Sequence, residues 1–234
     1  MQRLRAWKIR SFPCIGQWGF LQPKIASSPA LAVILERLKA GDSILDFGCC
    51  LGQDLRWLAA LGAPTNKMYG VDLHHEFWDI GFDLYQDKDR FKAQFICADI
   101  FDEISELNHL RGSIDIVYMG SVLHLWDWSG RVKALKEIVK LTRTGSLLVA
   151  CQIGRRQGQE TQTAWKNNPK SKVFFHDPHT VCELWAQVAA ETASEWDVTA
   201  KSVDVRMLLP EQRDSVWMGP DARVIIFEAR RSAP

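Results

Sequence analysis

Apolar segments of strand length alternate with segments whose apolar residues recur at helical spacing, and this alternation restricts the fold more than any other feature of the sequence. Strands are expected at residues 43–47, 67–73, 93–100, 113–120 and 145–153, with two further extended segments at 195–208 and 222–230. Helices are expected at residues 27–41, 53–62, 76–86, 102–110, 130–143 and 178–193. Such alternation builds a parallel sheet covered by helices on both faces. We therefore expect an α/β fold around a mostly parallel, seven-stranded sheet.

Length and charge limit the number of domains and the kinds of ligand. With 234 residues, 47% of them hydrophobic, the chain can bury one sizeable core. Its 29 basic and 28 acidic side chains nearly cancel, so no overall field draws it to nucleic acid or to an anionic membrane. No apolar stretch is long enough to span a bilayer. These features favour a cytoplasmic protein that binds a small molecule, and they leave a homodimer open.

The first residues of the chain are basic. Five basic residues and no acidic residue precede Glu36, a bias that organelle transit peptides share. The stretch FPCIGQWGF at residues 12–20 is broken by a proline and two glycines and carries three large aromatic side chains. This pattern suits a packed lid better than an amphipathic presequence. We therefore expect residues 1–26 to form an N-terminal lid or substrate cap, followed by one main domain at residues 27–234.

Cysteine spacing bears on metal binding and on disulfides. The six cysteines include no C-x-x-C pair, and several lie in apolar runs. Reduced thiols in a cytosolic interior are therefore expected, rather than a metal site or a disulfide framework. A polar, weakly periodic stretch at residues 154–172 is expected to be a long loop of the kind that often carries function.

The segment ILDFGCCLGQD, residues 44–54, joins the first expected strand to the following helix. Its glycines, Gly48 and Gly52, are spaced G-x-x-x-G, whereas a dinucleotide-binding turn reads G-x-G-x-x-G and holds a pyrophosphate. S-adenosylmethionine has no phosphate, but it carries an amino acid group and a sulfonium cation. Asp46 at the strand end can accept a hydrogen bond from an ammonium group, and small residues let the backbone approach the amino acid. The turn therefore favours S-adenosylmethionine over a dinucleotide.

Acidic or small residues also follow the next three strands. Asp72 ends the second strand, where a carboxylate can accept hydrogen bonds from both ribose hydroxyls. Asp99 follows the third, where it can accept from an adenine amino group while Ile100 supplies an apolar face. The fourth strand ends at Gly120, beside the point where a substrate would meet the methyl group. Each acid alone is better explained as a helix cap or a solvated loop residue, but the set fits a ligand along the carboxyl edge of an open sheet.

Five segments of the chain carry a resemblance to a known family. They are AWKIRSFPCIGQWGFL, ILDFGCCLGQDLRWLAALGAP, YGVDLHHEFWDIGFDLYQDKDRF, FICADIFD and SVLHLWDW. With them, the chain resembles the fungal S-adenosylmethionine-dependent methyltransferases of meroterpenoid and related polyketide–terpenoid biosynthesis over nearly its whole length. The resemblance implies a Rossmann-like class I methyltransferase fold, with residues 27–234 as the cofactor-binding methyltransferase domain. Family members usually have more residues before the AWK segment, so a shorter lid is expected here.

The residues and the resemblance together indicate where S-adenosyl-L-methionine binds. The expected contacts are Asp46, Gly48, Cys49, Cys50, Gly52, Val71, Asp72, Leu73, Ala98, Asp99, Ile100 and Gly120. Paired cysteines are the usual form of this turn in the family. Cys50, which stands where such turns usually have a glycine, is therefore expected to pack against the cofactor and to act neither as a nucleophile nor as a metal ligand. No metal is expected.

The resemblance implies methylation of an oxygen, often a carboxylate on a farnesylated aromatic acid. Trp18 and Trp126, two of the ten tryptophans, are expected at a small hydrophobic substrate; core or lid packing is the alternative. Arg155 is expected to pair with a substrate carboxylate, with a solvated surface charge as the alternative. His124 follows the fourth strand and is the expected catalytic residue, as a base or an orienting donor. A hydrogen-bonded structural histidine is the alternative there.

Three functions are compatible with these features. The first is an S-adenosylmethionine-dependent O-methyltransferase that forms a methyl ester on a hydrophobic prenylated aromatic acid or a related secondary metabolite. The second is an enzyme with the same fold that cyclises or isomerises a terpenoid or polyketide without methyl transfer, because a fold does not fix its chemistry. The third is a non-catalytic binding or accessory protein. We expect the first function, since the resemblance extends over nearly the whole chain.

Overall fold

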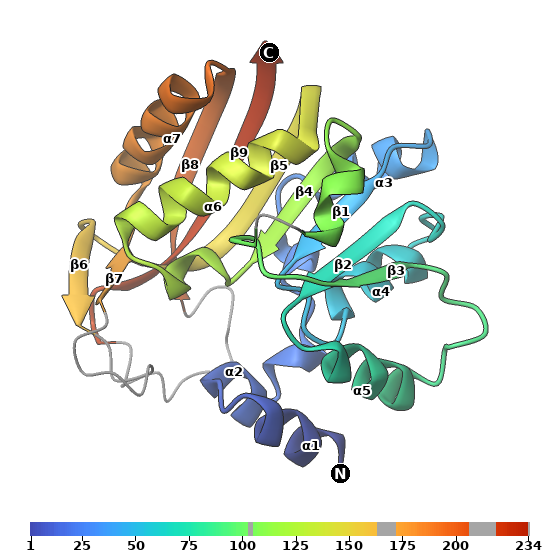
Figure 1. The fold of residues 1–234 in the computed structure, drawn as a ribbon. Helices are drawn as coiled ribbons and strands as arrows, with labels where there is room; N and C mark the ends of the chain where they lie inside the picture. The colour runs from blue at the N-terminus through green and yellow to red at the C-terminus, as the bar shows by residue number, and fades with distance from the viewer. Residues whose placement is uncertain (103–104, 163–171, 206–218, 234) are drawn as a thin grey trace.

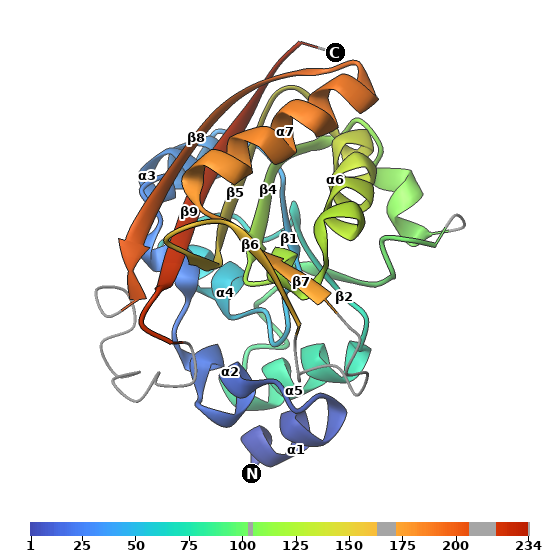
Figure 2. The same ribbon diagram turned by 90° about the vertical axis from the view of Figure 1, so that its left-hand side faces the viewer.

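A central sheet with helices on both faces organises the computed structural model, which describes residues 1–102, 105–162, 172–205 and 219–233 (Figure 1 and Figure 2). The seven strands lie in the order β3-β2-β1-β4-β5-β9-β8. Their bounds are β1 Ile44–Phe47, β2 Met68–Asp72, β3 Gln94–Cys97, β4 Ile114–Gly120, β5 Thr142–Arg155, β8 Glu195–Asp204 and β9 Ala222–Ala233. The expected α/β fold with seven strands is confirmed.

Strand direction follows the expected pattern. Strands β1 to β5 are parallel to one another, β9 runs antiparallel to β5, and β8 runs antiparallel to β9. β1 lies between β2 and β4, so the chain reverses its direction of travel across the sheet at β1 and β4. In open sheets of this kind, ligands bind beyond the carboxyl ends of the strands at the point where the order reverses.

Helices cover the two faces of the sheet because its central strands are apolar on both sides. All residues of β4 from Ile114 to Met119 are buried, as expected for a parallel strand between helical layers. One face packs against α3 (Leu31–Lys39), α4 (Gln53–Ala60) and α5 (His75–Tyr85), and the other against α6 (Trp128–Leu141) and α7 (Pro178–Thr192). Within the described residues, no helix has the length and apolar character needed to cross a bilayer.

Caps explain where several helices differ from their expected bounds. The Asp127 side chain accepts a hydrogen bond from Gly130 N at 2.8 Å, so α6 begins two residues earlier than expected. Ser28 Oγ accepts from Ala30 N at 3.2 Å in the turn before α3, and the helix proper starts at Leu31. The expected helix at 102–110 is reduced to a 3-10 helix, η3 Glu106–Leu110, behind a Ser105 cap.

The prediction of a long loop at residues 154–172 is wrong at both ends of that range. β5 continues to Arg155, and β6 (Gln159–Gln162) pairs antiparallel with β7 (Lys172–Phe175) in a separate two-stranded sheet. Val173 and Phe175 are buried while Lys172 is exposed, which is the alternation of a half-buried strand. Residues 163–171 of that expected loop lie outside the described part of the chain.

The N-terminal segment packs beneath the carboxyl edge of the parallel strands (Figure 1). It contains α1 (Gln2–Ile9), α2 (Pro13–Gly16) and two 3-10 helices, η1 (Gly19–Leu21) and η2 (Lys24–Ser27). Its apolar side chains form a small core with α5 and the β1–α4 turn, made by Ala6, Ile15, Phe20, Leu51, Phe77 and Ile80. This packing holds the segment over the place where the strand order reverses.

Candidate functional site

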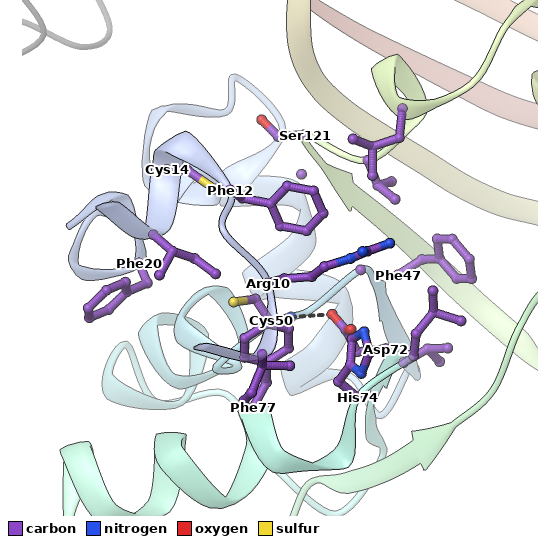
Figure 3. A pocket seen from close by; sticks show the side chains of 18 of the residues that line it. Arg10, Phe12, Cys14, Phe20, Phe47, Cys50, Asp72, His74, Phe77 and Ser121 are labelled. Carbon is purple, nitrogen blue, oxygen red and sulfur yellow. Dashed lines mark hydrogen bonds between the residues drawn. The ribbon is translucent and has the colours of Figure 1, made fainter. Parts of the chain in front are cut away.

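A cavity of about 740 Å³ lies between the carboxyl ends of β1, β2 and β4 and the N-terminal segment. Arg10, Phe12, Cys14 and Phe20 form part of its N-terminal wall (Figure 3). Ten of the residues expected to touch cofactor or substrate line it: Gly48, Cys50, Val71, Asp72, Leu73, Ala98, Asp99, Ile100, Gly120 and Trp126. They come from four different strand ends, so the fold brings together residues that are distant in sequence.

The β1–α4 turn reaches the cavity through an unusual backbone conformation. Gly48, Cys50 and Gly52 all have positive φ, at 76°, 49° and 70°. Cys50 therefore adopts a left-handed conformation that glycine enters without strain and that costs an L-residue roughly 1–2 kcal/mol. The N–H of Cys50 donates to Asp72 Oδ2 at 2.9 Å (Figure 3). This hydrogen bond fixes the turn against the end of β2 and offsets part of the strain.

Three expected contacts lie behind the cavity wall. Asp46 and Cys49 are buried beneath the turn, at 2% and 0% exposure. Gly52 packs against the ring of Trp78, and a Cβ at this glycine would lie 2.5 Å from Trp78 Cζ3. Gly52 therefore shapes the turn, while Asp46 remains close enough to the cavity to be affected by its charges.

Burial strongly disfavours the ionised form of Asp46. Its pKa is raised well above the ordinary value, first by burial and then by the negative charges of Asp54 and Asp72, while the positive charge of Lys24 opposes the rise. Among the described residues, Asp46 Oδ2 has no hydrogen-bond partner. A buried polar atom normally has one, so this oxygen is suited to accept a hydrogen bond from a ligand.

Aromatic side chains also line the cavity beyond the ends of β3 and β4. Asp99 Oδ1 accepts from Phe101 N at 3.0 Å, so this carboxylate also shapes the loop after β3. The Trp126 ring lies 5.6 Å from the Phe101 ring and 6.5 Å from the Phe47 ring, measured between centroids. Together with Ile100 these rings offer flat apolar surfaces beside a carboxylate, which is the combination expected for a nucleobase and a hydrophobic substrate.

His124 lies in η4 (Leu123–Leu125) and is not among the residues that line the cavity. Its side chain is buried, at 8% exposure. Burial lowers the pKa of His124 to about 3, and the positive charges of Lys24 and Arg131 act in the same direction. The imidazole is therefore neutral near pH 7. Its expected catalytic role stays a prediction.

Trp18 and Arg155 are also located outside the cavity lining. Trp18 is 44% exposed, and the Arg3 guanidinium lies 5.0 Å from the centre of its ring. Arg155 lies over the Phe175 ring at 4.7 Å. Neither residue is brought together with the strand-end acids, so their roles toward substrate remain predictions.

Several cavity residues were not anticipated from the sequence. Arg10, Phe12 and Lys24 come from the N-terminal segment, and Ser121 and His74 follow β4 and β2 by one and two residues. In Figure 3, the Arg10 side chain points from the N-terminal segment into the cavity, and His74 lies beside Asp72. Their position was the signal available in the sequence for two of them, because Ser121 and His74 come one and two residues after strand ends.

Known proteins decide what kind of site this is. A family model described as methyltransferase domain matches residues 44–145. The O-methyltransferase phiE of a fungal species is 38% identical over 244 residues, covering 98% of this chain and 80% of that protein. This chain belongs to the fungal S-adenosylmethionine-dependent methyltransferases. The expected family and cofactor are thereby confirmed, and the protein is an enzyme of this methyltransferase family.

Solved structures support the fold of the methyltransferase. Phosphoethanolamine N-methyltransferase 2 of Haemonchus contortus, in complex with phosphomonomethylethanolamine and S-adenosylhomocysteine, superposes with a TM-score of 0.58 at 14% identity. That match covers 86% of this chain and 52% of the other, so this chain spans about half of its length. The cyclase SpnF superposes with a TM-score of 0.60 at 15% identity, covering 87% of this chain and 80% of that one. The fold alone therefore does not fix the reaction.

The residues at the carboxyl edge fit S-adenosylmethionine. Asp46 has a buried carboxylate oxygen with no hydrogen-bond partner among the described residues, at the strand end where the cofactor ammonium is expected, and Asp72 lines the cavity where the ribose hydroxyls are expected. A Cβ at Gly48 would lie 3.0 Å from Val122 Cγ2, and its φ of 76° strains any other residue, so glycine is favoured at this point of the turn. Ala98, Asp99 and Ile100 remain for the adenine.

Proposed function

We propose that this methyltransferase forms a methyl ester on a carboxylate of a hydrophobic prenylated aromatic acid or a related secondary metabolite, in the cytoplasm. The observation that carries this assignment is the apolar character of the cavity around the end of β4. Val122, Leu125 and Trp126 line it there, with Phe12 and Val173 from other elements. Such walls suit a large apolar substrate, and a carboxylate is an acceptor that is already ionised near neutral pH.

A carboxylate acceptor needs no catalytic base, because it is already ionised near neutral pH. One oxygen lone pair of the carboxylate forms the bond to the methyl carbon as the carbon–sulfur bond breaks, and the sulfur keeps that electron pair as a neutral thioether. No proton moves in this exchange. The task of the chain is to align the two reactants and to exclude water. His124, neutral and set behind the wall, assists by position.

The N-terminal segment, residues 1–26, is assigned the role of a substrate cap. Phe12 and Phe20 line the cavity from this segment, while Ile15 and Ala6 anchor it in the small core with α5. Closing an apolar cavity over a substrate excludes water from the reacting atoms.

A labelled methyl donor tests the assignment. The enzyme is incubated with methyl-labelled S-adenosylmethionine and a panel of prenylated aromatic acids, together with the corresponding phenols that lack the carboxyl group. We expect label only in products of the acids, with one S-adenosylhomocysteine formed per product, and mild alkali should return the unlabelled acid. A labelled product that resists alkali, as an ether does, would exclude the ester. Product formation without S-adenosylhomocysteine would instead support the cyclisation or isomerisation alternative.

A further inference from the structure

Lys24 connects the N-terminal segment to the end of β4. Its Nζ donates to Ser121 Oγ at 2.5 Å, across 97 residues of sequence, and both residues line the cavity. Ser121 directly follows Gly120, the last residue of β4. The half-buried lysine therefore places a positive charge at the inner end of the cavity, where the strand order reverses.

The neighbouring backbone fixes the position of that charge. The next residue, Ile25, is fully buried, and its N–H donates to Asp54 Oδ1 at 2.8 Å. Asp54 lies in the first turn of α4, directly after the β1–α4 turn. Lys24 is thereby held beside the first turn of α4, close enough to Asp54 for the two charges to interact.

Lys24 and the carboxyl group of Asp46 are two polar groups that the described residues do not bring into contact. No ion pair within 4.0 Å in the described part of the chain includes Lys24. Asp46 Oδ2 is buried and has no hydrogen-bond partner among those residues. The two groups are nevertheless close enough for the lysine charge to influence the carboxyl group. A ligand with both charges on neighbouring atoms would satisfy both groups at once.

We propose that Lys24 binds the α-carboxylate of the amino acid arm of S-adenosylmethionine, while Asp46, just behind the cavity wall, accepts from its α-ammonium directly or through a water molecule. An α-amino acid is the zwitterion that this arrangement complements, because its ammonium and carboxylate share one carbon atom. The ammonium group of Lys24 then donates to two acceptors: Ser121 Oγ, and the cofactor carboxylate through a charge-assisted hydrogen bond. This assignment concerns the cofactor and is independent of which acceptor atom is methylated.

A substrate carboxylate is the competing partner for Lys24. Lys24 Nζ lies at Ser121, beside the end of β4, so a substrate carboxylate is within its reach. It is less favoured because the backbone next to Lys24 is bound to Asp54 of α4, and because the Lys24 charge acts on Asp46 at the end of β1, on the cofactor side of the cavity. The aromatic wall assigned to the substrate lies around Trp126 and Phe101. In both alternatives a carboxylate binds the ammonium group of Lys24. Cofactor analogues that differ only in having or lacking the carboxylate therefore distinguish the two.

Binding measurements without an acceptor provide the test. S-adenosylmethionine, its decarboxylated analogue and 5′-methylthioadenosine, which lacks the whole amino acid, are titrated by calorimetry into wild type, Lys24→Met and Lys24→Arg. We expect Lys24→Met to weaken S-adenosylmethionine binding by roughly 10- to 100-fold, the range for a hydrogen bond between charged groups. The decarboxylated analogue and 5′-methylthioadenosine should bind this variant as they bind wild type, and Lys24→Arg should retain part of the affinity. Lys8→Met removes an exposed charge from the same N-terminal segment and should change nothing.

Two results would overturn the assignment. Equal weakening of all three ligands in Lys24→Met would mean that the lysine only supports the structure of the cavity. Unchanged binding of S-adenosylmethionine, with a raised KM for the acceptor acid, would mean that Lys24 binds the substrate. If no acid in the panel is methylated, the ester proposal fails while these titrations still report on Lys24.

Discussion

The N–H of Cys50 donates to the Asp72 carboxylate at 2.9 Å and ties the β1–α4 turn to the end of β2. The bond uses the backbone of Cys50, so the residue type matters through conformation, with φ at 49°. Burial and the Asp72 charge raise the pKa of the Cys50 thiol, which keeps it protonated and a poor nucleophile. A cysteine occupies a glycine-like position here and contributes packing.

Replacing Cys50 tests this interpretation. Cys50→Gly should leave S-adenosylhomocysteine affinity within about threefold of wild type, because glycine adopts this φ without strain and keeps the N–H. Cys50→Val is the matched variant, since a β-branched residue is strongly disfavoured at positive φ. This variant should lower Tm by about 2–4 °C for each kcal/mol lost from the free energy of unfolding. Calorimetry and thermal unfolding give the two readouts. A large fall in turnover for Cys50→Gly with unchanged cofactor affinity would make the thiol part of the chemistry.

Asp72 has two roles that one substitution removes together. Asp72→Ala deletes the acceptor for Cys50 N and the carboxylate expected at the ribose. Cofactor binding should weaken by roughly 1.5–3 kcal/mol, the scale of hydrogen bonds to a charged group. Asp79→Ala, at an exposed position of α5, is the control and should bind as wild type does. Undiminished affinity of Asp72→Ala in calorimetry would remove Asp72 from the site.

Asp46 is expected to lower the stability of the unliganded fold and to support cofactor binding. Because its folded-state pKa is raised, its favourable contribution to folding is present below the ordinary pKa of 3.8 and is lost as the pH rises through the folded value. At pH 8 the unliganded Asp46→Asn variant should therefore have a higher Tm than wild type, by about 2–4 °C per kcal/mol gained, and the difference should shrink toward pH 4. Its affinity for S-adenosylhomocysteine should fall roughly 10- to 100-fold. A lower Tm at pH 8 would show that the carboxylate stabilises the unliganded fold.

The alternation of strands and helices was sufficient to predict the sheet, because burial on both faces leaves a continuous apolar signal such as β4. The same reasoning predicted a site at the ends of β1 to β4, and ten of its residues line one cavity. It missed β6 and β7, where Val173 and Phe175 provide only two buried positions in a polar stretch. A signal this short does not distinguish a strand from a loop.

The N-terminal contribution to the site could not be read from sequence. Lys24 reaches Ser121 across 97 residues, and no local periodicity encodes a contact of that range. Its charge was part of a basic bias that organelle targeting also explains. Arg155 was expected at the substrate because it follows the strand expected at residues 145–153; it is instead the last residue of β5 and lies over Phe175. Proximity to a strand end indicates which edge a residue occupies, but the packing of other segments decides what it faces.

His124 distinguishes ester formation from ether formation. Its pKa, lowered to about 3 by burial and by nearby positive charges, leaves it neutral across the range in which activity is measured. If the acceptor is an ionised carboxylate, kcat/KM should show no rising limb near the ordinary histidine pKa of about 6.5. His124→Gln should then lose less than the roughly 100-fold that removal of a general base costs.

The same residue should make unfolding sensitive to acid. The unfolded chain binds a proton at His124 below the ordinary value of 6.5, whereas the folded chain does so only near 3. Its contribution to stability is therefore present above pH 6.5 and is lost as the pH falls toward 3, at up to about 1.4 kcal/mol per pH unit. Denaturant unfolding of His124→Gln should depend less on pH than wild type between pH 6 and 4, and the slopes should agree above pH 7, where the imidazole is neutral in both states. A rate profile with a limb near pH 6.5 that disappears in His124→Gln would contradict both the buried neutral imidazole and methyl transfer to a carboxylate.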